Sequence, residues 1–397
     1  MKRIISVLIM MTILAGCFSL PIIASDLEEN DTNNGAEDNL TSNPSIELSA
    51  KSAILIEAQT GAVLYSKDAH LALPPASVTK IMTLLIVAES INAGVLTLDQ
   101  TVTVSENAAS KGGSQIFIKE GEEFTVEELL KSTVIASAND AAVALAELVA
   151  GSESEFVRRM NARATELGMK NTEFENCTGL DDSVTKHLTS AYDISIMSRE
   201  LIKHDIILKY SSVWQDSIRD GEFILTNTNR LVRYYAGCTG LKTGSTDKAG
   251  YCVSASAKRD GMHLIAVIMG AESRDKRNAD ARVLLDYGFS AYALYHEAEC
   301  EVENVPLKRS DKATVPIYAK EFAALVDRAN IKRIEKKYII PESLTAPLER
   351  GAVIGEVKYL LDGSEIGKSE IYLKDDAEEI NYVELLLKLL RLTVCGK

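Results

Sequence analysis

The strand-like segments of this chain lie at the two ends of a long helical stretch, and this order constrains the fold most. Near the start, two apolar runs within "AILIEAQTGAVLYS" flank Gln59-Thr60-Gly61, a pattern typical of a β-hairpin. Much later, "GLKTGSTDKAGYCVSASAKRDGMHLIAVIMGA" predicts adjacent antiparallel strands that turn near Gly250 and at Asp260-Gly261. Strands from both ends can share one sheet with helices packed on it, so we predict an α/β (α+β) domain.

Two segments between these strands carry clear helix signals. The first helix is predicted to begin at Pro74-Pro75, because proline suits the entrance of a helix. The second begins at Thr125-Val126-Glu127-Glu128, a capping-box pattern, and the Ala-rich "SANDAAVALAELVAG" follows it. The apolar residues at helical spacing in the first helix, which we expect to be buried, are Val78, Ile81, Met82, Leu85 and Ile86.

We predict that the layered domain spans residues 48–292, because the hydrophobic pattern of the sequence changes after it. From about Cys300 the sequence turns to short alternating runs, such as "VKYLLDGSEIGKSEIYL", which indicates a hairpin turning at Asp362-Gly363. We therefore predict a small β-rich domain over residues 293–378.

The N-terminus has the layout of an export signal. Lys2 and Arg3 precede an uncharged apolar stretch from Ile4 to Ser25, so residues 1–25 are predicted to be a signal peptide. We favour cleavage near Ala24 or Ser25. Two alternatives stay open: lipidation at Cys17 within "LAGC", and an uncleaved anchor, since the stretch is long enough to span a bilayer. All three place the protein on the extracytoplasmic face of the membrane.

Charge and cysteine usage exclude several classes of protein. Residues 26–50 hold seven acids and no base, so we predict a disordered acidic linker over 26–47.

The net charge of −14 argues against a nucleic-acid partner, which requires a basic face. Five cysteines follow the signal at irregular spacing, without a CxxC pair, which predicts unpaired thiols and no metal site, although a Cys238–Cys252 bridge is conceivable.

The last segment, 380–397, is predicted to be an amphipathic helix that holds the protein peripherally on a membrane surface. Its polar residues recur at helical spacing, and leucines cover almost all the remaining surface. About five buried leucines at roughly 1.5–3 kcal/mol each would suffice for attachment. The alternative is a helix that docks on the β domain or on a dimer partner. The polar residues are Asn381, Glu384, Lys388 and Arg391.

Three Ser-x-x-Lys matches raise the question of a serine nucleophile with its own base. Ser183-Lys186, in a second copy of "SVTK", lies in sequence without helical periodicity, and Ser273-Lys276 is a third match. Ser77-Lys80 differs, because Ser77 lies in the first turn of the predicted helix, where residues three apart share a face. We therefore predict Ser77 as the nucleophile and Lys80 as its base.

A lysine can act as a base only if burial or a second cation lowers its pKa. Lys242 in "LKTGST" is the candidate for that second cation, on a predicted strand where Gly244 lets a ligand approach the backbone. Between these motifs, the hydroxyl of Ser137 in "SAN" could relay a proton, and the amide of Asn139 could hold a substrate backbone. Each motif alone is weak evidence for a catalytic site, whereas the motifs taken together are specific evidence for one.

Together "SVTK", "SAN" and "KTG" resemble the active-site set of the penicillin-recognising serine enzymes. "PPASVTKIMT", "GSQIF", "ASANDAA" and "GAESRDKRNADARVLLDYGF" are similar to the serine-type D-alanyl-D-alanine carboxypeptidases, the low-molecular-mass penicillin-binding proteins. The resemblance covers about residues 48–292 and extends to the β domain and the tail. It implies their fold, an antiparallel sheet flanked by a helical cluster and followed by a small β-rich domain.

The resemblance implies removal of the terminal D-alanine from peptidoglycan stem peptides, covalent inhibition by β-lactam antibiotics, and no cofactor. Ser77 would form the acyl enzyme with Lys80 as general base, and Ser137 would pass a proton to the leaving amine. Asn139, Lys242, Thr243, Gly244, Ser245 and Arg277 would bind the substrate: the backbone of Ser245 completes the oxyanion hole, and Lys242, Thr243 and Arg277 hold the carboxylate. Arg274 is the alternative to Arg277. Some relatives carry histidine where this chain has Ser245.

Three rival functions remain. A class A-type β-lactamase shares the motifs, but its Glu-x-x-Leu-Asn string does not occur between Asn139 and Lys242. A D,D-transpeptidase shares the acyl enzyme and transfers it to an amine. A catalytically silent wall-binding protein would not react with penicillin at all.

Overall fold

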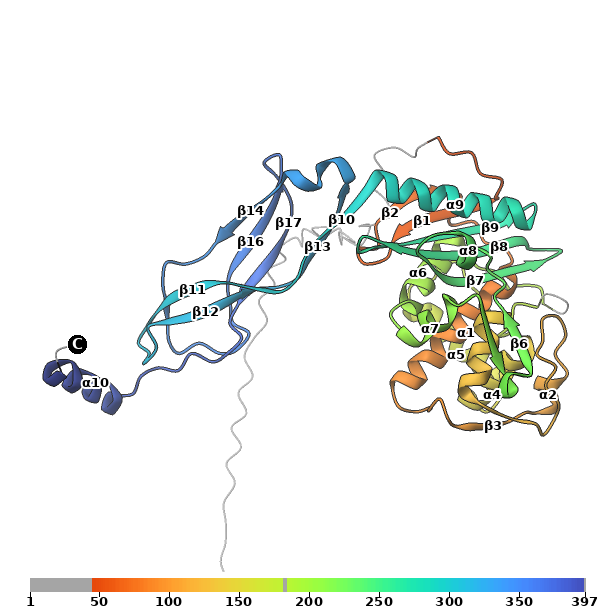
Figure 1. Ribbon diagram of the computed structural model, residues 1–397, viewed down its shortest axis with the longest axis horizontal. Helices are drawn as coiled ribbons and strands as arrows, with labels where there is room; N and C mark the ends of the chain where they lie inside the picture. The colour runs from red at the N-terminus through yellow and green to blue at the C-terminus, as the bar shows by residue number, and fades with distance from the viewer. Residues whose placement is uncertain (1–44, 181–183, 396–397) are drawn as a thin grey trace, which may run out of the picture.

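The computed structural model describes residues 45–180 and 184–395, which form a large mixed lobe, a separate β lobe and a terminal helix (Figure 1). The predicted signal peptide and most of the acidic linker lie outside the described residues. No helix among those described is long and apolar enough to cross a membrane.

A five-stranded antiparallel sheet organises the large lobe, in the order β2-β1-β9-β8-β7. β1, from the start of the lobe, pairs with β9, so that Leu55 lies opposite Ala266. The two ends of the sequence therefore share one sheet, as predicted. The strands are β1 (Ser52–Glu57), β2 (Val63–Lys67), β7 (Cys238–Thr246), β8 (Gly250–Arg259) and β9 (Met262–Ala271).

Helices cover both faces of this sheet (Figure 1). Ile54 and Ile56 of β1 pack into the core beneath the helical cluster, whereas Leu55 packs on the other side against the helix α9. The alternation follows from the two-residue period of a strand. The helices are α1 (Lys80–Asn92), α2 (Glu106–Ala109), α3 (Val126–Lys131), α4 (Asn139–Ala150), α5 (Glu153–Glu166), α6 (Ala191–Leu201), α7 (Asp205–Ser211), α8 (Leu231–Tyr234) and α9 (Arg274–Ala291).

The two predicted helix starts have different outcomes. At Thr125 the capping box forms, with reciprocal bonds between Thr125 and Glu128. At Pro74-Pro75 the prediction was approximate, because the first turn is a 3₁₀ helix, Ala76–Thr79, and α1 starts only at Lys80. Two short hairpins complete this lobe: β3 (Thr101–Thr103) with β4 (Glu123–Thr125), and β5 (Gln215–Ile218) with β6 (Phe223–Thr226).

The β lobe has its own core, which includes Ile317, Tyr359 and Ile371. The hairpin predicted at Asp362-Gly363 joins β16 to β17. Its strands are β10 (Tyr292–Glu297), β11 (Cys300–Lys308), β12 (Thr314–Ala319), β13 (Phe322–Asp327), β14 (Ile334–Ile339), β15 (Leu344–Thr345), β16 (Val353–Leu361) and β17 (Ser364–Tyr372).

The chain ends in helix α10 (Tyr382–Cys395), which extends away from the β lobe (Figure 1). Asn381 and Glu384 cap its first turn with reciprocal hydrogen bonds. Leu386 and Leu390 are each about half exposed, so the apolar surface of α10 is not covered by the β lobe.

The cysteines whose side chains are described are unpaired, and no Cys238–Cys252 bridge forms. Cys177 and Cys252 are buried, as small core residues often are. Over the same described residues, His, Cys, Asp and Glu side chains form no group of three or more that could hold a metal.

Candidate active site

Ser77 and Lys80 occupy the same face of the 3₁₀ turn that leads into α1. Residues three apart eclipse in a 3₁₀ helix, and Lys80 Nζ lies 3.1 Å from Ser77 Oγ. Ala76, directly before Ser77, has a φ of +48°, in the left-handed region that alanine rarely adopts. The turn thus presents a half-buried hydroxyl beside a fully buried amine.

Three acceptors surround the Lys80 amine. Besides Ser77, these are Asn139 Oδ1 at 2.5 Å and the carbonyl of Thr178 at 2.8 Å. Burial lowers the pKa of Lys80 to about 7, because charge is disfavoured away from water. A neutral amine can donate to Asn139 and Thr178 and still direct its lone pair at the Ser77 hydroxyl, which is the geometry of a general base.

Ser137 and Lys242 form a second serine–lysine pair facing the first. Lys242 Nζ donates to Ser137 Oγ at 2.7 Å and to the Thr243 carbonyl at 3.0 Å. Ser137 has a φ of +62° and connects a π-helical turn, Ser132–Ala136, to α4. π-turns and left-handed residues are common at functional sites, where they direct a side chain inward.

The electrostatics differ from the sequence-based expectation in one respect. Lys242 was expected to crowd Lys80, yet burial is what lowers the pKa of Lys80. The crowding acts on Lys242 itself: burial, the charge of Lys80 and the charge of Arg277 all hold its pKa well below the usual value. Both amines therefore lose protons more readily than free lysine does.

Asn139 ties the two pairs to a neighbouring loop. Its side chain accepts from Lys80 and donates to the Gly112 carbonyl at 2.7 Å, and its backbone N–H donates to the Ser114 carbonyl at 2.7 Å. In this structure the Asn139 amide positions Lys80. From the sequence alone, only a contact with the substrate was predicted for Asn139.

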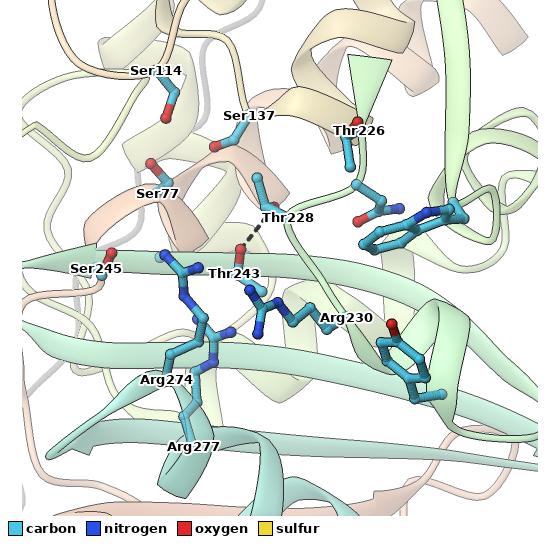
Figure 2. A pocket seen from close by; sticks show the side chains of 14 residues that line it. Ser77, Ser114, Ser137, Thr226, Thr228, Arg230, Thr243, Ser245, Arg274 and Arg277 are labelled. Atoms are coloured by element: carbon cyan, nitrogen blue, oxygen red, sulfur yellow. Dashed lines mark hydrogen bonds between the residues drawn. The ribbon is translucent and has the colours of Figure 1, made fainter. Parts of the chain in front are cut away.

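A cavity of about 650 Å³ opens over these groups, and Figure 2 shows the hydroxyls of Ser77 and Ser137 directed into it. Thr243 donates to Thr228 Oγ1 at 2.8 Å on its wall. Other lining residues that the sequence analysis did not identify are Ser114, Trp214, Thr226, Asn227, Thr228, Arg230 and Tyr234. Lys80, Asn139 and Lys242 lie behind the wall and reach the cavity through the serines.

Three arginines gather on one side of the cavity (Figure 2). Arg277, the predicted carboxylate ligand, lines the cavity but is buried, and its side chain donates to Asn278 Oδ1 and the Cys252 carbonyl. Its neighbour Arg274 lines the cavity as well and is exposed. Arg230 is a third cation that no sequence motif indicated. Arg274 and Arg277, the two carboxylate ligands considered from the sequence, both line this side of the cavity.

Of the other two Ser-x-x-Lys matches, only Ser273-Lys276 lies wholly within the described residues, and neither of its two residues lines this cavity. Ser183 lies outside the described residues. Ser273 caps α9, where its hydroxyl accepts from the backbone N–H of Lys276, and the Lys276 side chain pairs with Glu272. That match is a helix cap.

Gly244 lets strand β7 approach the turn that carries Ser77. A Cβ at this position would lie 2.8 Å from the Pro75 carbonyl oxygen and from Ser77 N, and 2.9 Å from Val78 N. All three atoms belong to the backbone, so none can move without displacing the turn.

We therefore expect Gly244→Ala to lower the rate of acylation by penicillin about 100-fold, because a shift of about 1 Å in a catalytic group has effects of this size. Stopped-flow or gel-based acylation rates measure this, with circular dichroism and the thermal midpoint as folding controls. A folded variant that acylates at the wild-type rate would show that this close approach is dispensable.

Comparisons with known proteins agree with the geometry. The family model described as D-alanyl-D-alanine carboxypeptidase matches residues 37–273, and that of the penicillin-binding protein 5 C-terminal domain matches 291–379. The chain is 38% identical to D-alanyl-D-alanine carboxypeptidase DacF of Bacillus subtilis over 393 residues, 97% of each protein. It is 33% identical to DacC of Escherichia coli over 347 residues, 85% of this chain and 86% of that one.

Solved structures give the same relationship. Penicillin-binding protein 5 of Haemophilus influenzae superposes with a TM-score of 0.71 at 29% identity, covering 85% of this chain and 100% of that one. Penicillin-binding protein D2 of Listeria monocytogenes, solved with ampicillin bound, has a TM-score of 0.57 at 31% identity, covering 62% of this chain and 100% of that one. On the paired serines and lysines and on these matches, the chain belongs to the D-alanyl-D-alanine carboxypeptidase family of penicillin-binding serine peptidases.

Proposed function

We propose that Ser77 opens the terminal D-Ala–D-Ala amide and carries the acyl group. The observation that carries this assignment is the convergence of two serine–lysine pairs on one cavity, Ser77 with Lys80 at 3.1 Å and Ser137 with Lys242 at 2.7 Å. Neutral Lys80 takes the Ser77 proton as the hydroxyl attacks the carbonyl. The backbone N–H groups of Ser77 and Ser245 stabilise the oxyanion, a contribution of about 3–4 kcal/mol per donor.

The departing amine requires a proton, and we assign its delivery to Ser137. Lys242 donates to Ser137 Oγ, so the Ser137 hydroxyl is free to donate toward the cavity. The terminal carboxylate lies against the arginines, with the guanidinium groups of Arg274 and Arg277 and the hydroxyl of Thr243 as ligands. Asn139 holds Lys80 and adds a contact to the peptide. Water then hydrolyses the ester and regenerates Ser77.

Mass spectrometry of the protein after exposure to benzylpenicillin tests this assignment. We expect one long-lived adduct on the peptide that contains Ser77, and release of free D-alanine from a pentapeptide stem. Rapid turnover of penicillin would favour a β-lactamase instead, and products extended by an added amino acid would favour a transpeptidase. An unlabelled protein without hydrolytic activity would mean a silent wall-binding protein.

We also propose the cellular arrangement: signal peptide 1–25, linker 26–47, catalytic domain 48–292, β-rich stalk 293–378 and a peripheral membrane helix 380–397. Support comes from the amphipathic sequence of the tail and from the exposed leucines of α10. The same mass spectrum reports the mature N-terminus, and so separates cleavage near Ala24 or Ser25 from lipidation at Cys17.

Deleting residues 380–397 from a form that lacks the signal peptide is expected to move the protein from the membrane to the soluble fraction. The reason is the loss of about five membrane-facing leucines at roughly 1.5–3 kcal/mol each. Vesicle sedimentation measures binding, and hydrolysis of a soluble peptide, which should stay unchanged, is the control. Continued sedimentation with vesicles would contradict the proposed anchor.

A further inference from the structure

A buried histidine, His187, is hydrogen-bonded to Thr79, the last residue of the 3₁₀ turn that carries Ser77. His187 Nε2 lies 2.7 Å from Thr79 Oγ1, although the two residues are 108 positions apart in the sequence. Both side chains are buried, and neither lines the catalytic cavity. They can therefore influence the reaction only through the groups that they hold in place.

The neighbouring contacts determine which ring nitrogen of His187 carries the hydrogen. The backbone N–H of Glu175 donates to Nδ1 at 2.9 Å, so Nδ1 is an acceptor without a hydrogen. The neutral imidazole then carries its hydrogen on Nε2 and donates it to Thr79 Oγ1. The Thr79 hydroxyl in turn donates its single hydrogen to the Ala76 carbonyl at 2.8 Å. The three bonds therefore run in one direction, from the Glu175 N–H to the Ala76 carbonyl.

The Ala76 carbonyl belongs to the same peptide unit as the backbone N–H of Ser77. This peptide is planar and trans, so its C=O and N–H point in opposite directions, and fixing one fixes the other. The Ser77 N–H is one of the two donors that we assign to the oxyanion hole. Ala76 has a φ of +48°, and a residue stays in such a conformation only where its surroundings hold it there. The Thr79 hydroxyl supplies part of that support.

The segment that contains His187 is itself fixed to the entrance of the turn. Thr189 exchanges two backbone hydrogen bonds with Leu73, at 2.8 and 3.0 Å, and Leu73 directly precedes Pro74-Pro75. The Phe174 ring packs against the imidazole, with 5.7 Å between the ring centroids. The position of the His187 ring is therefore set relative to the same turn that its hydrogen bond supports.

We infer that His187 is a positioning residue for acylation. Through Thr79 it holds the Ala76–Ser77 peptide, so that the Ser77 N–H is directed at the oxyanion. The inference rests on the proposed function, because the role is exerted on the same oxyanion hole. The effect should fall on the rate of acylation and leave binding unchanged, since an oxyanion donor acts on charge that develops in the transition state.

Two substitutions of His187 separate its bond to Thr79 from its bond to Glu175. The Gln amide reaches the position of Nε2 and can still donate to Thr79, whereas the Asn amide reaches only the position of Nδ1 and can still accept from Glu175. Each variant loses one buried hydrogen bond, so both should lower the thermal midpoint by about 2–4 °C. Acylation by benzylpenicillin should fall about 10- to 100-fold in His187→Asn and by no more than about threefold in His187→Gln.

Stopped-flow kinetics of the full-length protein measure the acylation rate constant and the dissociation constant of the non-covalent complex separately. We expect the loss in His187→Asn to lie in the rate constant, with complete labelling at long times. Thr79→Val removes the hydroxyl at nearly the same shape and should give a similar loss. The double variant should lose no more than either single one, because both act through one chain of bonds. His70→Asn, at an exposed histidine of the same lobe, is the matched control.

Equal acylation rates in His187→Asn and His187→Gln would overturn the inference, and so would a loss confined to the dissociation constant. If His187→Asn does not fold, Thr79→Val decides the question, since a folded Thr79→Val that acylates at the wild-type rate would also overturn it. In each of these cases the wild type still forms its adduct on Ser77, and the proposed function stands. A wild-type protein that forms no penicillin adduct would instead overturn the proposed function.

Discussion

Ser77→Ala is expected to abolish covalent labelling by penicillin and to lower carboxypeptidase activity by about 10⁴- to 10⁶-fold, as removal of the nucleophile does in other serine hydrolases. Ser137, the other serine of the two pairs, accepts a hydrogen bond from Lys242, whereas the buried base Lys80 contacts Ser77. Labelling with a fluorescent penicillin and release of D-alanine measure the two losses.

The duplicated tetrapeptide supplies the matched control. Ser183→Ala changes the same residue in the same four-residue string, and Ser273→Ala changes the third Ser-x-x-Lys match. Both variants should label and hydrolyse like the wild type, although Ser273→Ala should lower stability by about 1 kcal/mol through loss of a helix cap. If Ser77→Ala retained labelling while Ser183→Ala lost it, the assignment of the nucleophile would be wrong.

The second large effect concerns the protonation of Lys80. Its pKa is lowered to about 7 by burial, and only the neutral amine can accept the Ser77 proton. Acylation by penicillin should therefore be slow at about pH 5.5, rise through about pH 7 and level off above it. The sign follows from the role, since a group needed as a base gains activity as it loses its proton. Acylation rate constants measured across this range test the prediction.

The variant Lys80→Arg distinguishes the role of Lys80 as a base from the effect of its positive charge. Arginine keeps a cation near Ser77 and stays protonated throughout this range, so acylation should fall by about 10²- to 10⁴-fold without recovery at high pH. Lys209→Arg, on the exposed surface of α7, is the control for the substitution itself. A wild-type rate that does not change with pH would contradict a titrating base at this position.

Local sequence was enough to predict the elements that depend on neighbouring residues. The capping box at Thr125 and the hairpins at Gln59-Thr60-Gly61 and Asp362-Gly363 are contacts within a few residues, and all three form. Sharing of one sheet by both ends of the domain followed from the order of strand and helix signals. Ser77 could be proposed as the nucleophile because Ser77-Lys80 lies in the first turn of a predicted helix, whereas the second copy of the tetrapeptide, Ser183-Lys186, has no helical periodicity around it.

Contacts between distant segments could not be predicted in this way. The Thr178 carbonyl bonds Lys80 from a loop 98 residues away, and no sequence motif marks it. Gly179 follows with a φ of +82°, where a Cβ would lie 1.8 Å from the Ala76 carbonyl oxygen, so the same loop packs directly on the turn that carries Ser77. Arg230 likewise reaches the cavity from a segment without a signature.

The amino-acid sequence by itself determined which groups are available for chemistry, namely two serines, two lysines and an asparagine in ordered motifs, because reactivity depends on residue type and local spacing. Only the tertiary structure decided how those groups behave. Burial of Lys80 and Lys242 lowers their pKa values. The packing of β7 and of the 178–179 loop against the turn that carries Ser77 sets the distances between the serines and the lysines. Both depend on residues about a hundred positions apart, whose approach no local pattern encodes.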